Sequence, residues 1–394
     1  MDQNTQRGVP SDVTIDFQAP EEIVFGRGTA AETGQRARRH GDRALLVTDE
    51  RLADLGIIDP AIDSLETAGL DVEVFDGVEP DPTLSVIRAA VAAAREANAD
   101  VLVGVGGGSS IDVAKGAAVI LKNPDIEAEP FGRGHVSERG LPTMLLPTTA
   151  GSGAEVSPAV VVIDDRNGHE KKGIIDPNAF GTAAIVDPSL SETLPPEITR
   201  ATGIDAFAHA VGSVISTTSN PLADSICTRA MALVEGNLRP ATFHGPDAPE
   251  ARNAMALAAT TAMLGRVNGG KSAIHAVAYG IQSVYDVPHG EAIAAVLPAV
   301  LEYNLPAAVP TYASLGTQLY GAEGDARSRA ETFLEGVRRL RADVGLDARL
   351  REFGATEDDL DELAAMAVAS ERHLEANPRP VSTADARAVL EGIL

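Results

Sequence analysis

Tryptophan is absent from this chain of 394 residues, and cysteine occurs once, as Cys227. A single cysteine excludes an intramolecular disulfide and fits a reducing compartment. No uninterrupted apolar run approaches the roughly 18 residues of a membrane span. Residues 1–11 are polar and lack the apolar core of a signal peptide. We therefore expect a soluble, cytoplasmic protein without a membrane partner.

Positive charge is also scarce. The chain has 57 acidic and 32 basic residues, of which only five are lysines, and its formal net charge is -25 at pH 7. Such a charge argues against binding to nucleic acid or to an anionic membrane. An acidic, lysine-poor surface is typical of proteins from a salt-rich cytoplasm, where ions screen the repulsion between carboxylates. We expect a halophilic source, with an acidic mesophilic enzyme as the alternative.

The hydrophobic pattern changes near residue 196. Before it, short apolar runs typical of strands buried in a parallel sheet alternate with helical segments. The predicted strands are 23–26, 44–48, 72–75 and 101–105, and the predicted helices are 29–40, 86–98 and 111–122. Beyond it, only helical patterning remains, in the runs 201–216, 221–236, 251–264, 291–303 and 329–343. The sequence thus predicts an α/β dinucleotide-binding domain (1–196) and an all-α metal-binding domain (197–394), with a cleft between them.

A glycine-rich turn follows the predicted strand 101–105. Gly106, Gly107, Gly108 and Ser109 lead into the predicted helix 111–122, for which we expect a serine cap and Asp112 in the first turn. Glycines let a diphosphate approach the backbone, and amides at a helix N-terminus attract its charge. The run lacks the usual Gly-x-Gly-x-x-Gly spacing. A plain loop before a helix is the alternative.

Two further segments carry groups suited to a nucleotide. Asp49 follows the predicted strand 44–48, where a carboxylate can accept a hydrogen bond from a ribose hydroxyl, although a helix cap is the simpler interpretation. The segment 146–157 contains Thr148, Thr149 and Ser152 among glycines. These small polar side chains would hydrogen-bond a cofactor while leaving space for its rings.

Four residues form a candidate metal site. Asp205 and His209 lie four apart in a predicted helix and therefore share one face. His275 and His289 lie in mostly apolar surroundings, and Pro288-His289-Gly290 is typical of a tight loop. One carboxylate and three imidazoles suit a divalent metal and leave room for a substrate oxygen. Simple helix-face contacts and core histidines are the alternative.

At these residues the chain resembles the iron-containing (group III) alcohol dehydrogenase family. Thr202-Gly203 before the Asp205/His209 pair and the interval from His275 to His289 match the pattern of that family. The run that begins at Gly106 is similar to its phosphate loop, and the segment 377–380 is similar to its C-terminal end. The resemblance covers nearly the whole chain.

The resemblance implies a dehydroquinate-synthase-like architecture and hydride transfer between NAD and a small alcohol, diol or hydroxyacid. It implies Fe²⁺, replaceable by Zn²⁺, and a homodimer or larger assembly. The metal would lie on Asp205, His209, His275 and His289. The cofactor would lie on Asp49, Gly106, Gly107, Gly108, Ser109, Asp112, Thr148, Thr149, Ser152 and Lys171. Asp49 favours NAD over NADP, because it would repel a 2′-phosphate.

Three positions depart from the family or bear on its chemistry. Tyr279 stands where many members have a second histidine, and we consider it for proton transfer, although a phenol with a pKa of about 10 is a poor base near neutrality. A packing tyrosine is the alternative. Gly212 replaces a common acidic residue, and Lys271 would attract an anionic substrate if it faced the site.

Three other functions stay open at the level of sequence. A hydroxyacid–oxoacid transhydrogenase would keep NAD bound and release no NADH. A dehydroquinate-synthase-like lyase would need several basic residues around a phosphorylated substrate, and this lysine-poor chain has few near the ligands. A non-catalytic binding protein would be indicated by a failure to bind NAD.

Overall fold

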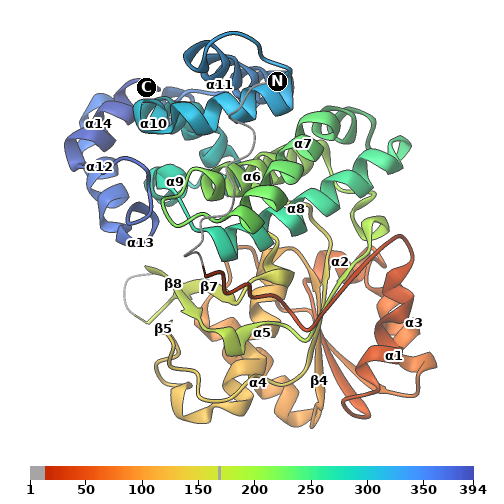
Figure 1. The fold of residues 1–394 in the computed structure, drawn as a ribbon. Coiled ribbons are helices and arrows are strands. Elements are labelled where there is room, and N and C mark those ends of the chain that lie inside the picture. Colours follow the sequence, from red (N-terminus) through yellow and green to blue (C-terminus); the bar gives the residue numbers. More distant parts are fainter. Residues whose placement is uncertain (1–13, 167–169) are drawn as a thin grey trace.

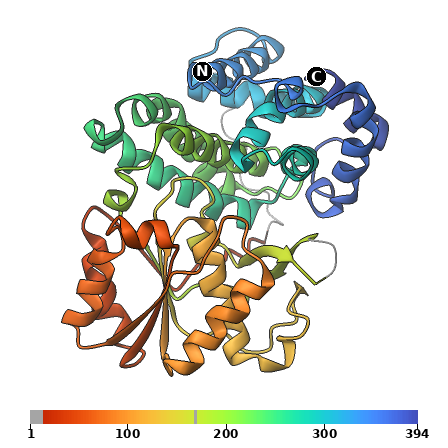
Figure 2. The same ribbon diagram turned by 180° about the vertical axis from the view of Figure 1, so that it is seen from behind.

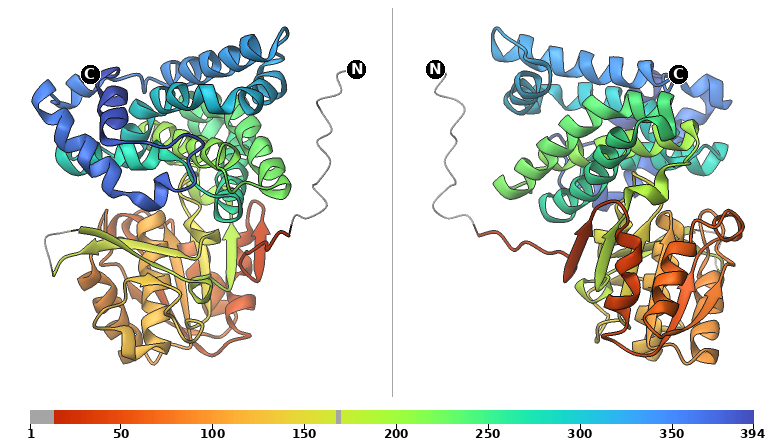
Figure 3. Two further views of the ribbon diagram at one scale, coloured as in Figure 1. Left: turned by 60° about the vertical axis from the view of Figure 1, so that its left-hand side comes forward. Right: turned by 90° about the vertical axis from the view of Figure 1, so that its right-hand side faces the viewer.

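A computed structural model describes residues 14–394 except 167–169, so the prediction about residues 1–11 lies outside the described residues. The chain forms an α/β half, coloured red to yellow-green in Figure 1, and a helical half, coloured green to blue. Figures 2 and 3 show from other directions that the helical half covers one end of the α/β half. The last strand ends at Val186 and the first long helix begins at Pro196. The predicted division at residue 196 coincides with this change, and as a division into domains it stays a prediction.

The α/β half is built on a six-stranded sheet in which every pair of neighbours is parallel. The order across the sheet is β1 (Glu22–Phe25), β9 (Ala183–Val186), β6 (Thr143–Pro147), β4 (Val101–Gly106), β2 (Arg43–Val47) and β3 (Asp71–Phe75). Every residue of β4 and β6 is buried, which confirms the prediction of a parallel sheet covered on both faces.

Alternate residues of the central strands enter two separate cores. Leu45 and Leu102 lie in the core beneath α4 (Leu84–Glu96) and α5 (Gly108–Lys122). Their neighbours Leu46 and Val103 lie in the opposite core, beneath α1 (Thr33–Ala37) and α3 (Asp59–Thr67). Since successive side chains of a strand point to opposite faces, both faces of the sheet are filled. The short helix α2 (Glu50–Asp54) follows β2.

A second sheet has no counterpart in the sequence prediction. Its strands, in the order β5 (Gly132–Arg133), β8 (Glu170–Ile175) and β7 (Ala159–Asp164), include an antiparallel pair, β7 and β8. The pattern was missed because most of β8 is half-buried and begins Glu-Lys-Lys, which lacks the apolar alternation of a typical strand.

The helical half has one continuous core. Its helices are α6 (Pro196–Val214), α7 (Pro221–His244), α8 (Pro249–Gly269), α9 (Ala273–Tyr285), α10 (His289–Tyr320), α11 (Ala326–Asp343), α12 (Leu360–Ala369), α13 (Glu371–Leu374) and α14 (Thr383–Glu391). Proline occupies the first position of α6, α7 and α8. The N–H group at that position has no acceptor within the helix, so proline, which lacks an N–H, costs no hydrogen bond there. The sequence predicted the five long helices, although α10 extends well beyond the predicted run 291–303, and it missed α9, α12 and α13.

One helix of the described residues, α10, is long and apolar enough by composition to cross a membrane, which the absence of an unbroken apolar run did not predict. Its most apolar window has a mean hydropathy of 1.5, and 67% of that window is buried inside the protein. Burial of this extent is what a core helix of a globular protein shows. The apolar composition of α10 is therefore explained by packing.

The segment after β6 joins the two halves. A Cβ on Gly151 would lie 2.5 Å from Cβ of Thr202 in α6, and a Cβ on Gly153 would lie 2.2 Å from Cβ of Met263 in α8. Gly153 also has a φ of +62°, so glycine is favoured there for its backbone as well. These contacts hold residues 148–153 directly against the helices that carry the site described next.

Candidate metal centre

Three helices position the predicted metal ligands. Asp205 and His209 lie one turn apart in α6, and both side chains are almost fully buried. His275 is the third residue of α9, and His289 is the first residue of α10. The prediction that Pro-His-Gly forms a tight loop is wrong, because Pro288 is instead the N-cap of α10. A proline before a helix fixes the chain direction much as a turn would, which explains the misreading.

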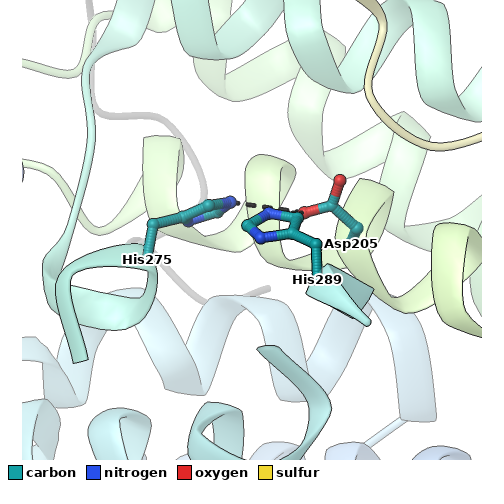
Figure 4. A group of neighbouring side chains, drawn as sticks. All are labelled: Asp205, His275 and His289. Carbon is teal, nitrogen blue, oxygen red and sulfur yellow. Dashed lines mark hydrogen bonds and ion pairs between the residues drawn. The ribbon is translucent and has the colours of Figure 1, made fainter. Parts of the chain in front are cut away.

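The helices bring the four side chains together. The Nε2 atoms of His209, His275 and His289 lie 3.4, 3.3 and 3.6 Å from the same atom, Oδ1 of Asp205. The rings of His209 and His275 stack with centroids 4.8 Å apart. Figure 4 shows Asp205, His275 and His289, whose ligand atoms all lie within 4.8 Å of one another. The predicted set of four is thus assembled at one point.

Neighbouring side chains show which nitrogens carry hydrogen. Nη1 of Arg266 lies 3.0 Å from Nε2 of His275, and because a guanidinium only donates, this Nε2 has a free lone pair. Oε1 of Gln282 lies 3.0 Å from Nδ1 of His289, and because an amide oxygen only accepts, the hydrogen is on Nδ1. In the neutral ring, Nε2 of His289 then carries no hydrogen, so its lone pair points toward Asp205.

The protonation states of the four side chains suit a metal ion. Burial lowers the pKa of His209 and of His275 well below the usual value for histidine, so both are neutral at pH 7. The pKa of Asp205 also lies well below its usual value, although burial alone would raise it, so the carboxylate is ionised at pH 7. An anionic oxygen surrounded by neutral imidazole nitrogens is a donor set that fits a divalent transition metal.

Sequence reasoning missed Arg266 and Gln282. Arg266 lies in the last turn of α8, and the chain reverses at Gly270, which has a φ of +111°, to bring the guanidinium beside α9. No periodic signal in the sequence shows this contact. Gln282 lies two helical turns after His275, and this spacing on one helix face would have identified it.

Most predicted cofactor residues lie at the carboxyl ends of three adjacent strands. Asp49 follows β2, the turn 106–109 follows β4, and Thr148, Thr149 and Ser152 follow β6. A Cβ on Gly107 would lie 3.6 Å from Cγ2 of Thr149, and one on Gly108 would lie 3.1 Å from Oγ of Ser152. The structure therefore brings these two segments into contact, at the edge where parallel sheets bind nucleotides.

The helix after the glycine turn begins earlier than predicted. The sequence predicts residues 111–122 with a serine cap, whereas α5 begins at Gly108 with Gly107 as its N-cap. No side chain caps this end, so the first amides of α5 are available to an anion. These uncapped backbone amides are the groups to which a diphosphate would bind.

Three predicted cofactor residues have structural partners. Oδ1 of Asp49 accepts from N of Leu52 at 3.0 Å and caps α2, which was the simpler interpretation. Asp112 accepts from N of Val161 in β7 at 2.9 Å and pairs with Lys115. Nζ of Lys171 donates to Oδ1 of Asp81 at 2.9 Å. The cofactor roles of these three residues stay predictions.

Two departures from the family pattern also have a structural setting. A Cβ on Gly212 would lie 2.9 Å from Oγ of Ser272, so the larger acidic side chain common in the family would require a shift here. Tyr279 lies one turn after His275 in α9 and is partly exposed. Its role in proton transfer stays a prediction.

Comparisons with known proteins agree with this arrangement. The family described as "Iron-containing alcohol dehydrogenase" matches residues 20–188, and "Fe-containing alcohol dehydrogenase family, C-terminal" matches residues 199–394. Long-chain-alcohol dehydrogenase 1 of Geobacillus thermodenitrificans is 34% identical over 375 residues, covering 93% of each chain. Sulfoacetaldehyde reductase of Bilophila wadsworthia is 33% identical over 379 residues, covering 94% of this chain and 97% of that protein.

The same agreement holds for the fold. The solved structure of a 1,3-propanediol oxidoreductase superposes with a TM-score of 0.91 at 31% identity, covering 97% of this chain and 100% of that one. The resemblance and the fold class predicted from the sequence are confirmed. The chain belongs to the iron-containing alcohol dehydrogenase family, whose members are oxidoreductases that use NAD(H) and an iron ion.

Proposed function

We propose that the protein interconverts a small alcohol, diol or hydroxyacid with its aldehyde, with hydride passing to or from NAD(H). The observation that carries the proposal is the convergence of three imidazole Nε2 atoms on Oδ1 of Asp205. When bound, the metal supplies a Lewis acid that lowers the pKa of a substrate hydroxyl, and NAD supplies the hydride acceptor. Family membership favours Fe²⁺, and Zn²⁺ would also bind these ligands.

The residues of this chain would hold and orient the reactants. Asp205, His209, His275 and His289 would hold the metal, and the free amides at the start of α5 would hold the diphosphate of NAD. The two sites are linked through Gly151, which contacts Thr202 one turn of α6 before Asp205. Thr148, Thr149 and Ser152 lie along this link and would position the nicotinamide half.

Two proposed roles concern the proton and the ribose. Tyr279, one turn after His275, would relay the hydroxyl proton to solvent, since its side chain is partly exposed. Asp49 would accept from a ribose hydroxyl through the carboxylate oxygen that does not cap α2. Lys171, held by Asp81, would lie at the cofactor side of the site.

The experiment is NADH formation after anaerobic loading with Fe²⁺ or Zn²⁺, tested with short primary alcohols, diols and hydroxyacids. We expect metal-dependent turnover that is lost in His275→Ala and retained in His244→Ala, a matched change at the exposed end of α7. If metal and NAD both bind but no substrate produces NADH, the dehydrogenase is wrong. Exchange of hydride between a hydroxyacid and an oxoacid with retained NAD would then identify a transhydrogenase.

The setting of the enzyme is also proposed. A net charge of -25 argues against a nucleic-acid partner, and the burial of α10 argues against a membrane span. We propose a cytoplasmic homodimer or larger assembly, with activity that rises with salt as in halophilic proteins. Light scattering at low and high salt would measure the assembly, and a monomer at both would contradict it.

A further inference from the structure

Arg266 lies beside the proposed metal ligands. Its Nη1 is 3.0 Å from Nε2 of His275, a nitrogen that faces Asp205. Among the described residues, the guanidinium makes no ion pair with a carboxylate, although the charge of Asp205 is near enough to favour its protonated form. Burial lowers the pKa of Arg266 to about 10, which leaves it positive at neutral pH. Arg338 pairs with Glu302 and Glu335, and an arginine without a carboxylate partner such as Arg252 donates instead to hydroxyl and backbone oxygens.

Arg266 donates to the lone pair on Nε2 of His275, which is the lone pair that a metal ion would use. A metal held by Nε2 of His275 takes this acceptor away from the guanidinium. Oδ1 of Asp205, the point on which the ligands converge, would then be engaged as well. A partly buried guanidinium without an acceptor is costly, so in the loaded enzyme Arg266 would be available to an acceptor from elsewhere, and an anion would be the strongest one.

Other basic groups reinforce the positive charge at this point. The ring of His373, in α13, stacks on His275 with centroids 6.2 Å apart. The pKa of His373 lies well below its usual value because the ring is buried and because Lys271, Arg266 and Arg133 disfavour its protonation. Three cationic side chains from different parts of a chain of net charge -25 therefore act on His373, whose ring stacks on His275.

We propose that Arg266 binds the anionic group of the substrate, so that the preferred substrate is a short hydroxyacid or hydroxysulfonate and its aldehyde. This inference rests on the proposed function and names the substrate class. A guanidinium matches the planar, two-oxygen edge of a carboxylate and also binds a sulfonate. Arg266 is then the residue that selects an anionic substrate over a neutral alcohol, with Lys271 and Arg133 adding attraction at longer range.

The reaction is that of the proposed function. In the oxidative direction the carbinol C–H bond breaks and its hydride goes to NAD⁺, the hydroxyl proton goes to solvent, and a C=O bond forms. The carboxylate or sulfonate is unchanged and serves only for binding.

The kinetic test compares hydroxyacids with diols of the same length. The pairs are 3-hydroxypropionate with 1,3-propanediol and 4-hydroxybutyrate with 1,4-butanediol, with 2-hydroxyethanesulfonate against ethylene glycol as the sulfonate arm. We expect kcat/KM to favour the anion in the native enzyme. In Arg266→Met this preference should fall roughly 10- to 100-fold, the loss expected for a charge-assisted hydrogen bond. Arg266→Lys should fall between the two, and Arg338→Met should match the native enzyme.

A binding measurement makes the result independent of turnover. Butyrate and ethanesulfonate are titrated by calorimetry into protein loaded with Zn²⁺ and NAD⁺, after metal content and circular dichroism have been matched among the variants. We expect Kd to rise in Arg266→Met by the same factor and to stay unchanged in Arg338→Met. The better of the two ligands identifies the carboxylate or the sulfonate.

The two proposals fail differently. If diols are oxidised as well as hydroxyacids, and neither the preference nor the anion Kd changes in Arg266→Met, the anion site is wrong and the dehydrogenase stands. If no alcohol is oxidised but butyrate or ethanesulfonate still binds in an Arg266-dependent way, the dehydrogenase is wrong and the anion site stands.

Discussion

Oε1 of Gln282 lies 3.0 Å from Nδ1 of His289 and orients the most exposed of the proposed metal ligands. The side chain of His289 is 41% exposed, whereas those of the other ligands are 10% exposed or less. The amide of Gln282 also donates, at 3.5 Å, to Asp81, which accepts from Lys171 of β8. A series of polar contacts therefore connects Lys171 in the α/β half, through Asp81 and Gln282, to His289 in the helical half.

Replacing Gln282 tests this positioning role. In Gln282→Leu, Nδ1 of His289 loses its acceptor, so the ring is free to rotate and to move its hydrogen to Nε2. We expect the Kd for Zn²⁺ to rise about 10- to 100-fold, as for other partners of metal-bound histidines. Competition with a chromophoric chelator measures it. Gln318→Leu, which removes only a surface contact with Ser314, is the control. Equal affinities in both variants would contradict the role.

Asp49 allows its two proposed roles to be separated. Its Oδ1 caps α2, and its carboxylate is proposed to favour NAD over NADP. Asparagine caps helices as well as aspartate does but carries no charge. We expect Asp49→Asn to keep thermal stability while lowering the KM for NADP. Asp49→Ala should lose about 1 kcal/mol of stability as well. If Asp49→Asn leaves the preference for NAD unchanged, Asp49 is a helix cap only.

The buried histidines make the metal-free protein sensitive to acid. The pKa values of His209 and His275 are well below the usual value because burial disfavours the charged ring, whereas in the unfolded chain they are about 6.5. Below about pH 6.5 the unfolded chain therefore binds more protons than the folded one, and stability falls as the pH falls. The slope is about 1.4 kcal/mol per pH unit for each histidine.

Urea unfolding in the presence of a chelator, from about pH 7.5 down to 5.5, measures this slope. Protonation of the many carboxylates changes stability over the same range, so the native protein is compared with His209→Gln. We expect the variant to have the shallower slope. Identical slopes would mean that His209 titrates equally in the folded and unfolded states, and that its burial has no effect.

The grouping of the four proposed metal ligands could be predicted from the sequence, partly from local spacing and partly from the family resemblance. Asp205 and His209 share a helix face wherever α6 lies, and the intervals to His275 and His289 matched a known pattern. The start of α5 was placed too late because the prediction required a serine cap. The structure shows that Gly107 and Gly108 begin the helix without a side-chain cap, which leaves their amides available to a ligand.

Contacts set by the packing of distant segments could not be predicted. Arg266 reaches His275 because the chain turns at Gly270, between α8 and α9. In the sequence Arg266 looks like an ordinary surface charge, so this contact could not be predicted. Strand β8 was missed because only one of its residues is buried and it begins with three charged residues, whereas β7 has the apolar, β-branched run of a strand and was overlooked. Sequence periodicity reports burial, and it is weakest where burial is partial.

Gly290 tests how closely the metal centre depends on the packing of α10 against α6. A Cβ at this position would lie 2.2 Å from the backbone oxygen of Ala201, so in Gly290→Ala the first turn of α10 must move away from α6. This turn carries His289, and the displacement should separate it from Asp205. We expect a loss of about 1–3 kcal/mol in the free energy of unfolding, together with weaker Zn²⁺ binding.

Gly236→Ala is the matched control. Gly236 lies in the middle of α7 at a solvent-exposed position, and a Cβ there would meet nothing within 4 Å. Alanine costs less conformational entropy than glycine in a helix, so this variant should gain about 0.5–1 kcal/mol and bind Zn²⁺ normally. Opposite signs for the same chemical change, measured by urea unfolding and by chelator competition, would show that contact with Ala201 and not helix propensity is decisive. A Gly290→Ala protein with native stability and native Zn²⁺ affinity would mean that α10 can withdraw from α6 without moving His289 from the ligand set.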